Sequence, residues 1–198
     1  MTWLVGLVTA LMLTLAPITA PAEASPPPAA EHAKAVTTKK KVPTRAQWLA
    51  DVKTAMKGSR AYVRQRVAAK GTDEKLAVNF DIDNTVIATY YDGGGAIPQM
   101  ARFAKLLRRL GVDLVFNSGR LANQQRRTFQ QLTRTGFPAA ELCLRTKGET
   151  LPAGKQRCRD SFIDDGYTLI ANIGNNDTDF VGDGYEKAFR LPNYGVLG

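Results

Sequence analysis

Three clusters of polar residues in this sequence have the residue types and spacing to carry out chemistry at an anionic centre. They are the segments 81–85 (Asp-Ile-Asp-Asn-Thr), 117–120 (Asn-Ser-Gly-Arg) and 174–179 (Gly-Asn-Asn-Asp-Thr-Asp). In the first cluster, Asp81 and Asp83 project to the same side of an extended chain because they are two residues apart. One carboxylate can then act as a nucleophile while the other transfers protons. The sequence therefore suggests paired-carboxylate chemistry.

Each cluster follows a predicted β-strand, and predicted helices separate the strands. Apolar runs predict strands over residues 76–81, 112–116, 141–144, 167–173 and 188–191. A helix over 156–165, with Gly166 as its stop, separates the third strand from the fourth. This alternation predicts a parallel α/β sheet with right-handed crossovers. Ligands bind at the carboxyl ends of such strands, so we expect the three clusters to meet there, together with Lys155.

The scarcity of histidine argues against several kinds of enzyme. His32 is the only histidine, and it lies in a segment that we expect to be a linker. Phosphohistidine phosphatases, His-dependent triads and most zinc hydrolases are therefore disfavoured. Residues 148–155 do not match a P-loop, and no GxSxG motif surrounds Ser118. The chemistry must depend on carboxylates, hydroxyls, amines and a hard metal ion.

The segment Phe80-Asp81-Ile82-Asp83-Asn84-Thr85 resembles the DxDxT motif of phosphatases of the haloacid dehalogenase (HAD) superfamily. Combined with segment 117–120, Lys155 and segment 174–179, it is similar to the secreted acid phosphatase branch of that superfamily. The segment Leu191-Pro192-Asn193-Tyr194 also resembles the end of those enzymes. The resemblance extends from about Thr44 to the end of the sequence, and its four motifs in order are specific.

The resemblance implies a role for each of these side chains. Asp81 is the expected nucleophile, which forms an acyl-phosphate, and Asp83 is the expected general acid and base. Ser118 would hold phosphoryl oxygens and Lys155 would offset negative charge, which completes the catalytic set. The expected substrate-binding residues are Thr85, Asn117, Gly119 and Arg120. The expected cofactor is Mg²⁺, and its expected ligands are Asp81, Asp83 (through its backbone carbonyl), Asn175 and Asp179.

Asn175 departs from the family pattern, which usually has an acid directly after the glycine. A neutral amide oxygen can still bind Mg²⁺, but the site then has one negative charge fewer. The consequence is either weaker metal binding or a protein without catalytic activity. Lys147 is an alternative to Lys155 for the lysine role, and the spacing of the residues that follow favours Lys155.

We expect one α/β domain over residues 44–198, a Rossmann-like (HAD) three-layer domain with a parallel sheet and no large cap. The intervals between motifs are too short for an inserted cap domain. Residues 44–74 are expected to form an N-terminal helical arm that packs on the main domain. Residues 90–95, with two tyrosines and three glycines, suit either a small flap over the site or a plain surface loop.

The first residues of the sequence have the pattern of a secretory signal peptide. An apolar run precedes Ala22-Glu23-Ala24, so residues 1–24 are expected to be removed before Ser25. A transmembrane anchor is the alternative, but Pro17 and the short run argue against it. Residues 25–43 are expected to be a flexible basic linker that makes weak contact with cell-wall or other polyanions. The mature protein is expected to be secreted, without a stable membrane span.

Cys143 and Cys158 are the only cysteines. Outside the cytosol a disulfide between them is favoured over two buried free thiols. Their spacing excludes a CxxC zinc or redox site.

The formal net charge of +9 favours anionic partners, such as phosphoesters, nucleic acid or a polyanionic cell wall. We therefore expect a secreted Mg²⁺-dependent phosphomonoester hydrolase that acts through an aspartyl-phosphate. One alternative is a catalytically silent HAD-like protein that binds cell-wall or nucleic-acid polyanions. Another is a phosphotransferase, in which an alcohol takes the phosphoryl group.

Overall fold

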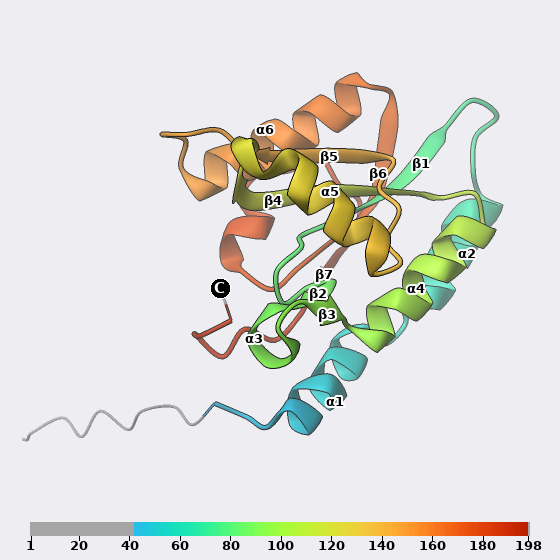
Figure 1. The fold of residues 1–198 in the computed structure, drawn as a ribbon. Coiled ribbons are helices and arrows are strands. Elements are labelled where there is room, and N and C mark those ends of the chain that lie inside the picture. The colour runs from blue at the N-terminus through green and yellow to red at the C-terminus, as the bar shows by residue number, and fades with distance from the viewer. Residues whose placement is uncertain (1–41, 198) are drawn as a thin grey trace, which may run out of the picture. The chain divides into compact units, whose positions relative to one another are not determined.

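The computed structural model describes residues 42–197, and its central element is a five-stranded sheet in which all neighbouring strands run parallel (Figure 1). The strands are β1 (Lys75–Phe80), β4 (Asp113–Leu121), β5 (Glu141–Arg145), β6 (Tyr167–Gly174) and β7 (Ala188–Arg190). Their order in the sheet is β5-β4-β1-β6-β7, so β1 lies in the middle. The predicted signal peptide, the predicted linker as far as residue 41, and His32 lie outside the described residues.

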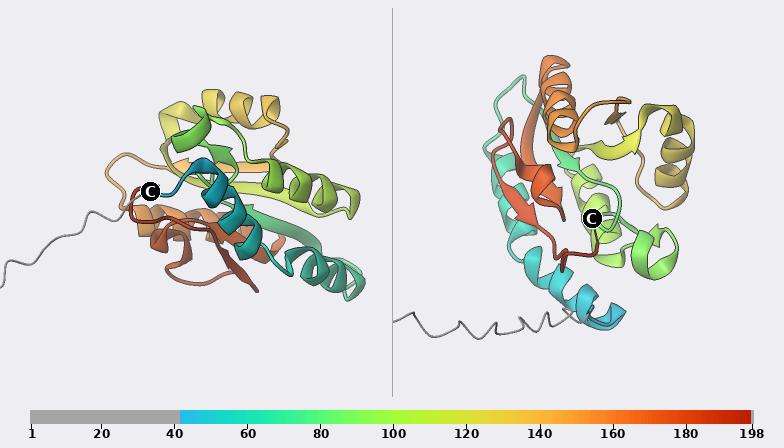
Figure 2. Two further views of the ribbon diagram at one scale, coloured as in Figure 1. Left: turned by 90° about the horizontal axis from the view of Figure 1, so that it is seen from below. Right: turned by 90° about the vertical axis from the view of Figure 1, so that its left-hand side faces the viewer.

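Helices on both faces of the sheet give the molecule three layers (Figure 2). They are α1 (Arg45–Ala55), α2 (Ser59–Ala68), α4 (Pro98–Arg109), α5 (Gln125–Arg134) and α6 (Leu151–Asp164), with the 3₁₀ turns η1 (Ala122–Gln124) and η2 (Asp177–Phe180). From β1 the chain passes through α4 to β4 and through α5 to β5, at one edge of the sheet, and then returns through α6 to β6 on the other side of β1. Because such crossovers are right-handed, α4 and α5 lie on one face of the sheet and α6 lies on the other. The predicted three-layer parallel α/β fold is confirmed.

Two apolar clusters hold the layers together, one on each face of the sheet. On the α4 face, Phe80 of β1 stacks on Phe116 of β4, with ring centroids 5.6 Å apart. On the α6 face, Phe162 and Cys158 pack with Ala77 of β1. Because successive strand residues point to opposite faces, β1 supplies side chains to both clusters.

The amino-terminal helices pack on α4, the helix that follows the central strand. Thr44 caps α1 by accepting the backbone N–H of Gln47 at 3.2 Å. Trp48 of α1 is fully buried, and its ring stacks on Tyr91 with centroids 4.7 Å apart. Arg45 pairs with Asp92 at 2.5 Å, so α1 is joined to the segment that follows the acidic cluster.

That segment is a small hairpin, and among residues 42–197 there is no larger insertion that could act as a cap. It consists of β2 (Ile87–Ala88), the single-turn helix α3 (Thr89–Asp92) and β3 (Gly95–Ala96). The residues proposed as a flap therefore form part of an ordered hairpin that is tied to the helical arm.

Two predicted element boundaries were wrong. Helix α6 begins at Leu151 rather than at residue 156, because Thr150 caps it through the N–H of Ala153 and Pro152 suits a first turn. Strand β4 extends to Leu121 rather than ending at residue 116, because its polar end still pairs with β5.

Cys143 of β5 and Cys158 of α6 form a disulfide, which confirms the favoured pairing. None of the helices in the described part of the chain is long and apolar enough to span a membrane.

Candidate active site

The three polar clusters and Lys155 meet at the carboxyl ends of the strands, around a pocket of about 320 Å³. The residues that line it come from all four sequence motifs, from two other positions (Thr89 and Leu151) and from the last described residues. They are Asp81, Asp83, Asn84, Thr89, Ser118, Gly119, Arg120, Leu151, Lys155, Asn176, Thr178, Asp179 and Leu197.

Asp81 follows directly on the central strand, and its carboxylate is held from two sides. Its Oδ1 accepts the Nζ of Lys155 at 2.6 Å, and its Oδ2 accepts the hydroxyl of Thr85 at 2.9 Å. The residue is only 7% exposed, and this burial raises the pKa of its carboxyl to about 6, against the opposing effect of Lys155. Near neutral pH the carboxylate is therefore ionised, desolvated and fixed in orientation.

Lys155 connects two of the carboxylates. Its ammonium contacts Asp81, Asp179 at 2.8 Å and the carbonyl oxygen of Asn117 at 2.7 Å, which uses all three of its N–H donors. Burial acts to lower the pKa of Lys155, but the two carboxylates outweigh it and raise that pKa. The lysine thus remains charged in a nearly closed position, whereas the competing Lys147 is exposed at the surface.

Asp83 also lines the pocket and is paired with Arg120. The guanidinium donates two bonds of 2.7 Å to its carboxylate, and the hydroxyl of Thr89 donates a third at 2.6 Å. Burial acts to raise the pKa of Asp83, but these bonds outweigh it and hold the pKa below its ordinary value. In this structure Asp83 is an ion-pair partner rather than a proton donor.

In the second cluster, Ser118, Gly119 and Arg120 line the pocket, whereas Asn117 does not. Ser118 is nearly buried, and its hydroxyl accepts the backbone N–H of Arg120 at 3.3 Å. Asn117 donates its side-chain amide to the carbonyl of Lys155 at 2.7 Å. Neither Asn117 nor Thr85 is among the residues that line the pocket, and their side chains bond to the carbonyl of Lys155 and to the carboxylate of Asp81.

The fourth cluster forms a tight turn around Asp179. Its Oδ2 accepts the backbone N–H groups of Asn175 and Asn176 at 3.0 and 2.9 Å, while its Oδ1 faces Lys155. A side chain at position 174 would come within 2.3 Å of this carboxylate, so only glycine fits there. The carboxylate of Asp179 is therefore already engaged by two backbone N–H groups and by Lys155.

Asn175 makes a contact that the sequence did not suggest. Its side-chain Nδ2 donates to the backbone carbonyl of Leu197 at 2.7 Å, and the same carbonyl accepts the Nδ2 of Asn84 at 2.9 Å. Leu197 is 1% exposed and lines the pocket. The backbone carbonyl of Leu197 thus joins Asn84 of the first motif to Asn175 of the fourth. Residue 175 must donate a hydrogen bond to this carbonyl, and an ionised aspartate has no hydrogen to donate.

The residues present are chemically suited to Mg²⁺, although the set is low in charge. Within residues 42–197 no group of three or more His, Cys, Asp or Glu side chains could hold a metal ion. An ion would depend on the Asp81 carboxylate, the backbone carbonyl of Asp83 and the amide oxygen of Asn175. These donors are all oxygens, and Mg²⁺ commonly uses one or two carboxylates and retains several waters.

Comparison with known proteins places this chain in a family. Residues 92–197 match the family described as HAD superfamily, subfamily IIIB (acid phosphatase). The sequence is 29% identical to the stem 31 kDa glycoprotein of Glycine max over 58% of this chain and 56% of that protein. It is 25% identical to vegetative storage protein 1 of Arabidopsis thaliana over 76% of this chain and 65% of that protein. The chain thus spans less than two thirds of the length of these relatives.

The fold is similar to that of a solved bacterial enzyme. The class C acid phosphatase from Bacillus anthracis superposes with a TM-score of 0.62 and 22% identity, over 76% of this chain and 79% of that chain. A structure of that enzyme with tungstate bound matches with a TM-score of 0.61. At this level of identity the likeness supports the fold alone.

Proposed function

Because the chain belongs to subfamily IIIB of the HAD superfamily, the acid phosphatases, we propose that it hydrolyses phosphomonoesters with Asp81 as the nucleophile. The observation that carries the proposal is the buried contact of Lys155 with Asp81 and Asp179. A fixed cation beside an ionised carboxylate reduces the repulsion between that carboxylate and an incoming phosphate.

In the first step, an Asp81 oxygen attacks phosphorus, and the bond from phosphorus to the leaving alcohol oxygen breaks. Asp83, which takes up a proton from solvent once its pair with Arg120 has opened, gives that proton to the leaving oxygen. In the second step, water attacks the phosphoryl group on Asp81, and Asp83 takes the proton from that water. Phosphate leaves and the Asp81 carboxylate is restored.

The pair of Asp83 and Arg120 must open before Asp83 can transfer a proton. An incoming phosphate can compete for Arg120, because a guanidinium binds two phosphate oxygens as well as it binds a carboxylate. Substrate binding would then release Asp83 for acid–base work. Ser118 and the backbone at Gly119 would hold the remaining phosphoryl oxygens.

The charges at the site favour a divalent ion. The carboxylates of Asp81, Asp83 and Asp179 outnumber the cations of Lys155 and Arg120, although the substrate is itself an anion. We propose Asp81, the Asp83 carbonyl and Asn175 as ligands of Mg²⁺, with Asp179 joining them only if it releases Lys155. When bound, the ion would supply positive charge that offsets the phosphate.

A second hollow of about 310 Å³ adjoins the catalytic pocket and suits the leaving group. It is lined by Thr89, Gly93, Gly94, Arg120, Gln124, Arg127, Thr128 and Gln131. Thr89 and Arg120 belong to both pockets, and both contact Asp83. Because Asp83 would protonate the leaving oxygen, the leaving group is expected to enter this polar hollow. A sugar or polyol phosphate fits it better than a large apolar ester.

The disulfide supports export, because such bonds persist in oxidising compartments. We therefore propose that the protein acts outside the cytosol.

The test is hydrolysis of 4-nitrophenyl phosphate by wild type and Asp81→Asn, each with Mg²⁺ or with EDTA. Metal-dependent activity that is lost in the variant is the expected result. Equal background rates in all four samples would favour the second candidate, a catalytically silent polyanion-binding protein, which the neutral Asn175 favours. Phosphate transfer to added glycerol, detected by product analysis, would identify a phosphotransferase.

A further inference from the structure

A groove formed by α1, α2 and α4, which shares no lining residue with the catalytic pocket, concentrates positive charge. Helices α2 and α4 contain no acidic residue, and α1 contains only Asp51, whose carboxylate bonds to Gln47 and Tyr194. Apart from Arg45, which pairs with Asp92, these helices and the turn after α1 carry eight exposed cations: Lys53, Lys57, Arg60, Arg64, Arg102, Lys105, Arg108 and Arg109. In the described part of the chain, none of the eight forms an ion pair.

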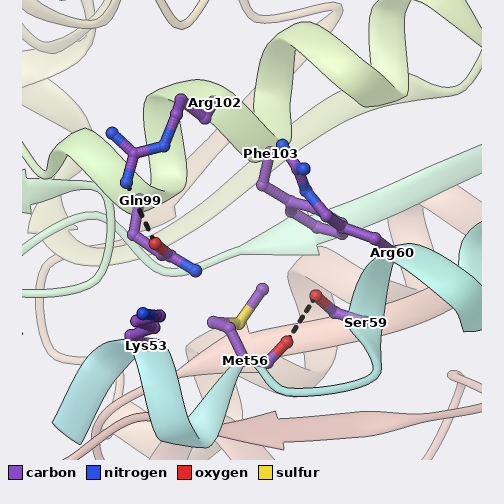
Figure 3. Close-up of a pocket in the computed structure, with 7 residues that line it drawn as sticks. All are labelled: Lys53, Met56, Ser59, Arg60, Gln99, Arg102 and Phe103. Carbon is purple, nitrogen blue, oxygen red and sulfur yellow. Dashed lines mark hydrogen bonds between the residues drawn. The ribbon is translucent and has the colours of Figure 1, made fainter. Parts of the chain in front are cut away.

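The cations surround hollows rather than a flat surface. One hollow, of about 300 Å³, lies between the end of α1, the start of α2 and α4, and Figure 3 shows Lys53, Arg60 and Arg102 around it. Gln99 and the buried Ser59 add polar groups to its wall. An adjoining hollow of about 810 Å³ also contains Lys57. On α4, the cations continue from Arg102 to Arg109, which is about 10 Å along the helix axis.

We propose that this groove binds a linear phosphate polymer, such as inorganic polyphosphate or a polyol phosphate chain. Uncompensated cations along a groove attract a chain of regularly spaced anions, and arginine forks match phosphate oxygens. This binding is separate from the proposed hydrolysis and does not depend on it.

The composition of the groove disfavours other anionic partners. Its aromatic residue, Phe103, is 2% exposed and cannot stack on nucleic-acid bases. The exposed large apolar side chains of the described residues all lie outside α1, α2 and α4, so nothing on this face is suited to insertion into a membrane.

The experiment measures binding of the full chain to fluorescent long-chain polyphosphate, in EDTA to prevent hydrolysis, at several salt concentrations. Four phosphate contacts predict a slope of log affinity against log salt of roughly −3, or about 60-fold weaker binding at 200 mM than at 50 mM salt. A groove variant replaces four cations with glutamine: Lys53→Gln, Lys57→Gln, Arg60→Gln and Arg102→Gln. It is expected to bind at least tenfold more weakly, with a shallower salt slope.

A matched variant removes two arginines and two lysines from other exposed positions: Arg126→Gln, Arg134→Gln, Lys147→Gln and Lys187→Gln. It has the same net charge as the groove variant and is expected to retain most of the affinity.

If the groove variant does not fold, Lys105→Gln, Arg108→Gln and Arg109→Gln on α4 provide a second test, with an expected intermediate loss of affinity. Equal losses in the groove and matched variants would overturn the proposal, as would tighter binding of duplex DNA or a sulfated polysaccharide. Polyglycerol phosphate in place of polyphosphate identifies which phosphate polymer binds more tightly.

Discussion

Replacing Asn175 with aspartate restores the acid of the family pattern, and we expect it to destabilise the protein in the absence of Mg²⁺. The amide of Asn175 now donates to the carbonyl of Leu197 at 2.7 Å in a position that is 5% exposed. A carboxylate there would set two acceptor oxygens against each other. Losing the bond and leaving a buried acceptor unsatisfied costs about 1–3 kcal/mol, and more for a charged group. For a chain of this size, that lowers Tm by roughly 2–12 °C.

Magnesium is expected to reverse this loss, because a cation held by Asp81 and the new carboxylate would offset the added charge. Acid is expected to reverse it as well. Burial raises the folded-state pKa of such a carboxyl above its unfolded value, so stability returns as pH falls through the folded-state pKa. The protonated acid can again donate to the Leu197 carbonyl. Thermal unfolding of the full chain, with and without Mg²⁺ between pH 5 and 8, measures both effects.

The control is Asn84→Asp, which removes the other donor to the same carbonyl and keeps the acceptor for the N–H of Tyr90. Asn84 has a φ of 55°, a conformation that aspartate tolerates. This variant should lose stability to a similar degree, but Mg²⁺ should not restore it. The reasoning is refuted if Asn175→Asp is as stable as wild type in EDTA, or if Mg²⁺ stabilises both variants equally.

Four further changes test other parts of the structure. Lys155→Met should lower kcat by about 10²–10³-fold and the free energy of unfolding by roughly 3–5 kcal/mol, because two buried carboxylates lose their partner. Steady-state kinetics and urea unfolding measure these two losses, and an unchanged free energy of unfolding would contradict the prediction. Arg127→Gln should lower kcat/KM for a sugar phosphate about three- to tenfold but leave 4-nitrophenyl phosphate unaffected, whereas the adjacent Arg126→Gln should change neither. The hydrogen bond from Arg157 lowers the pKa of Glu149 from 4.5 to about 2. Ionised Glu149 therefore stabilises the fold above about pH 4.5, and this stabilisation is lost as pH falls towards 2. Glu149→Gln should flatten the dependence of Tm on pH over that range, and identical dependences in wild type and variant would disprove the prediction. Reducing the disulfide, whose cysteines are 15 residues apart, should cost about 3 kcal/mol, while a Cys143→Ala, Cys158→Ala variant should not respond to the reductant.

Features that depend on local pattern could be predicted from the sequence. Apolar runs ending in polar residues indicated the strands, and the parallel topology then placed Asp81, Ser118 and Asp179 at one edge. The preference for Lys155 over Lys147 agrees with the observed position of Lys155. The start of α6 was misjudged because Gly154 and the short segment before it resemble a loop, whereas Thr150 and Pro152 begin a helix.

Features that depend on contacts between distant segments could not be predicted. The bonds to Leu197 join it to Asn84, 113 residues earlier, and to Asn175, and no local pattern marks them. Arg120 was expected to bind substrate, but its bonds to Asp83 appear only after β4 packs beside β1. The basic groove likewise exists because α1 and α2 pack on α4.

The central position of β1 has a consequence for how the protein reaches its folded state. On one side β1 pairs with β4, whose residues follow soon after it, but its other partner, β6, spans residues 167–174. During synthesis one edge of β1 therefore stays unpaired until β6 has been made, and such long-range parallel pairing is slow. Chains interrupted before β6 would expose an apolar edge that is prone to aggregate. Completion of the catalytic pocket is thus a late event in folding, since Lys155 and Asp179 reach Asp81 only when the last strands are in place.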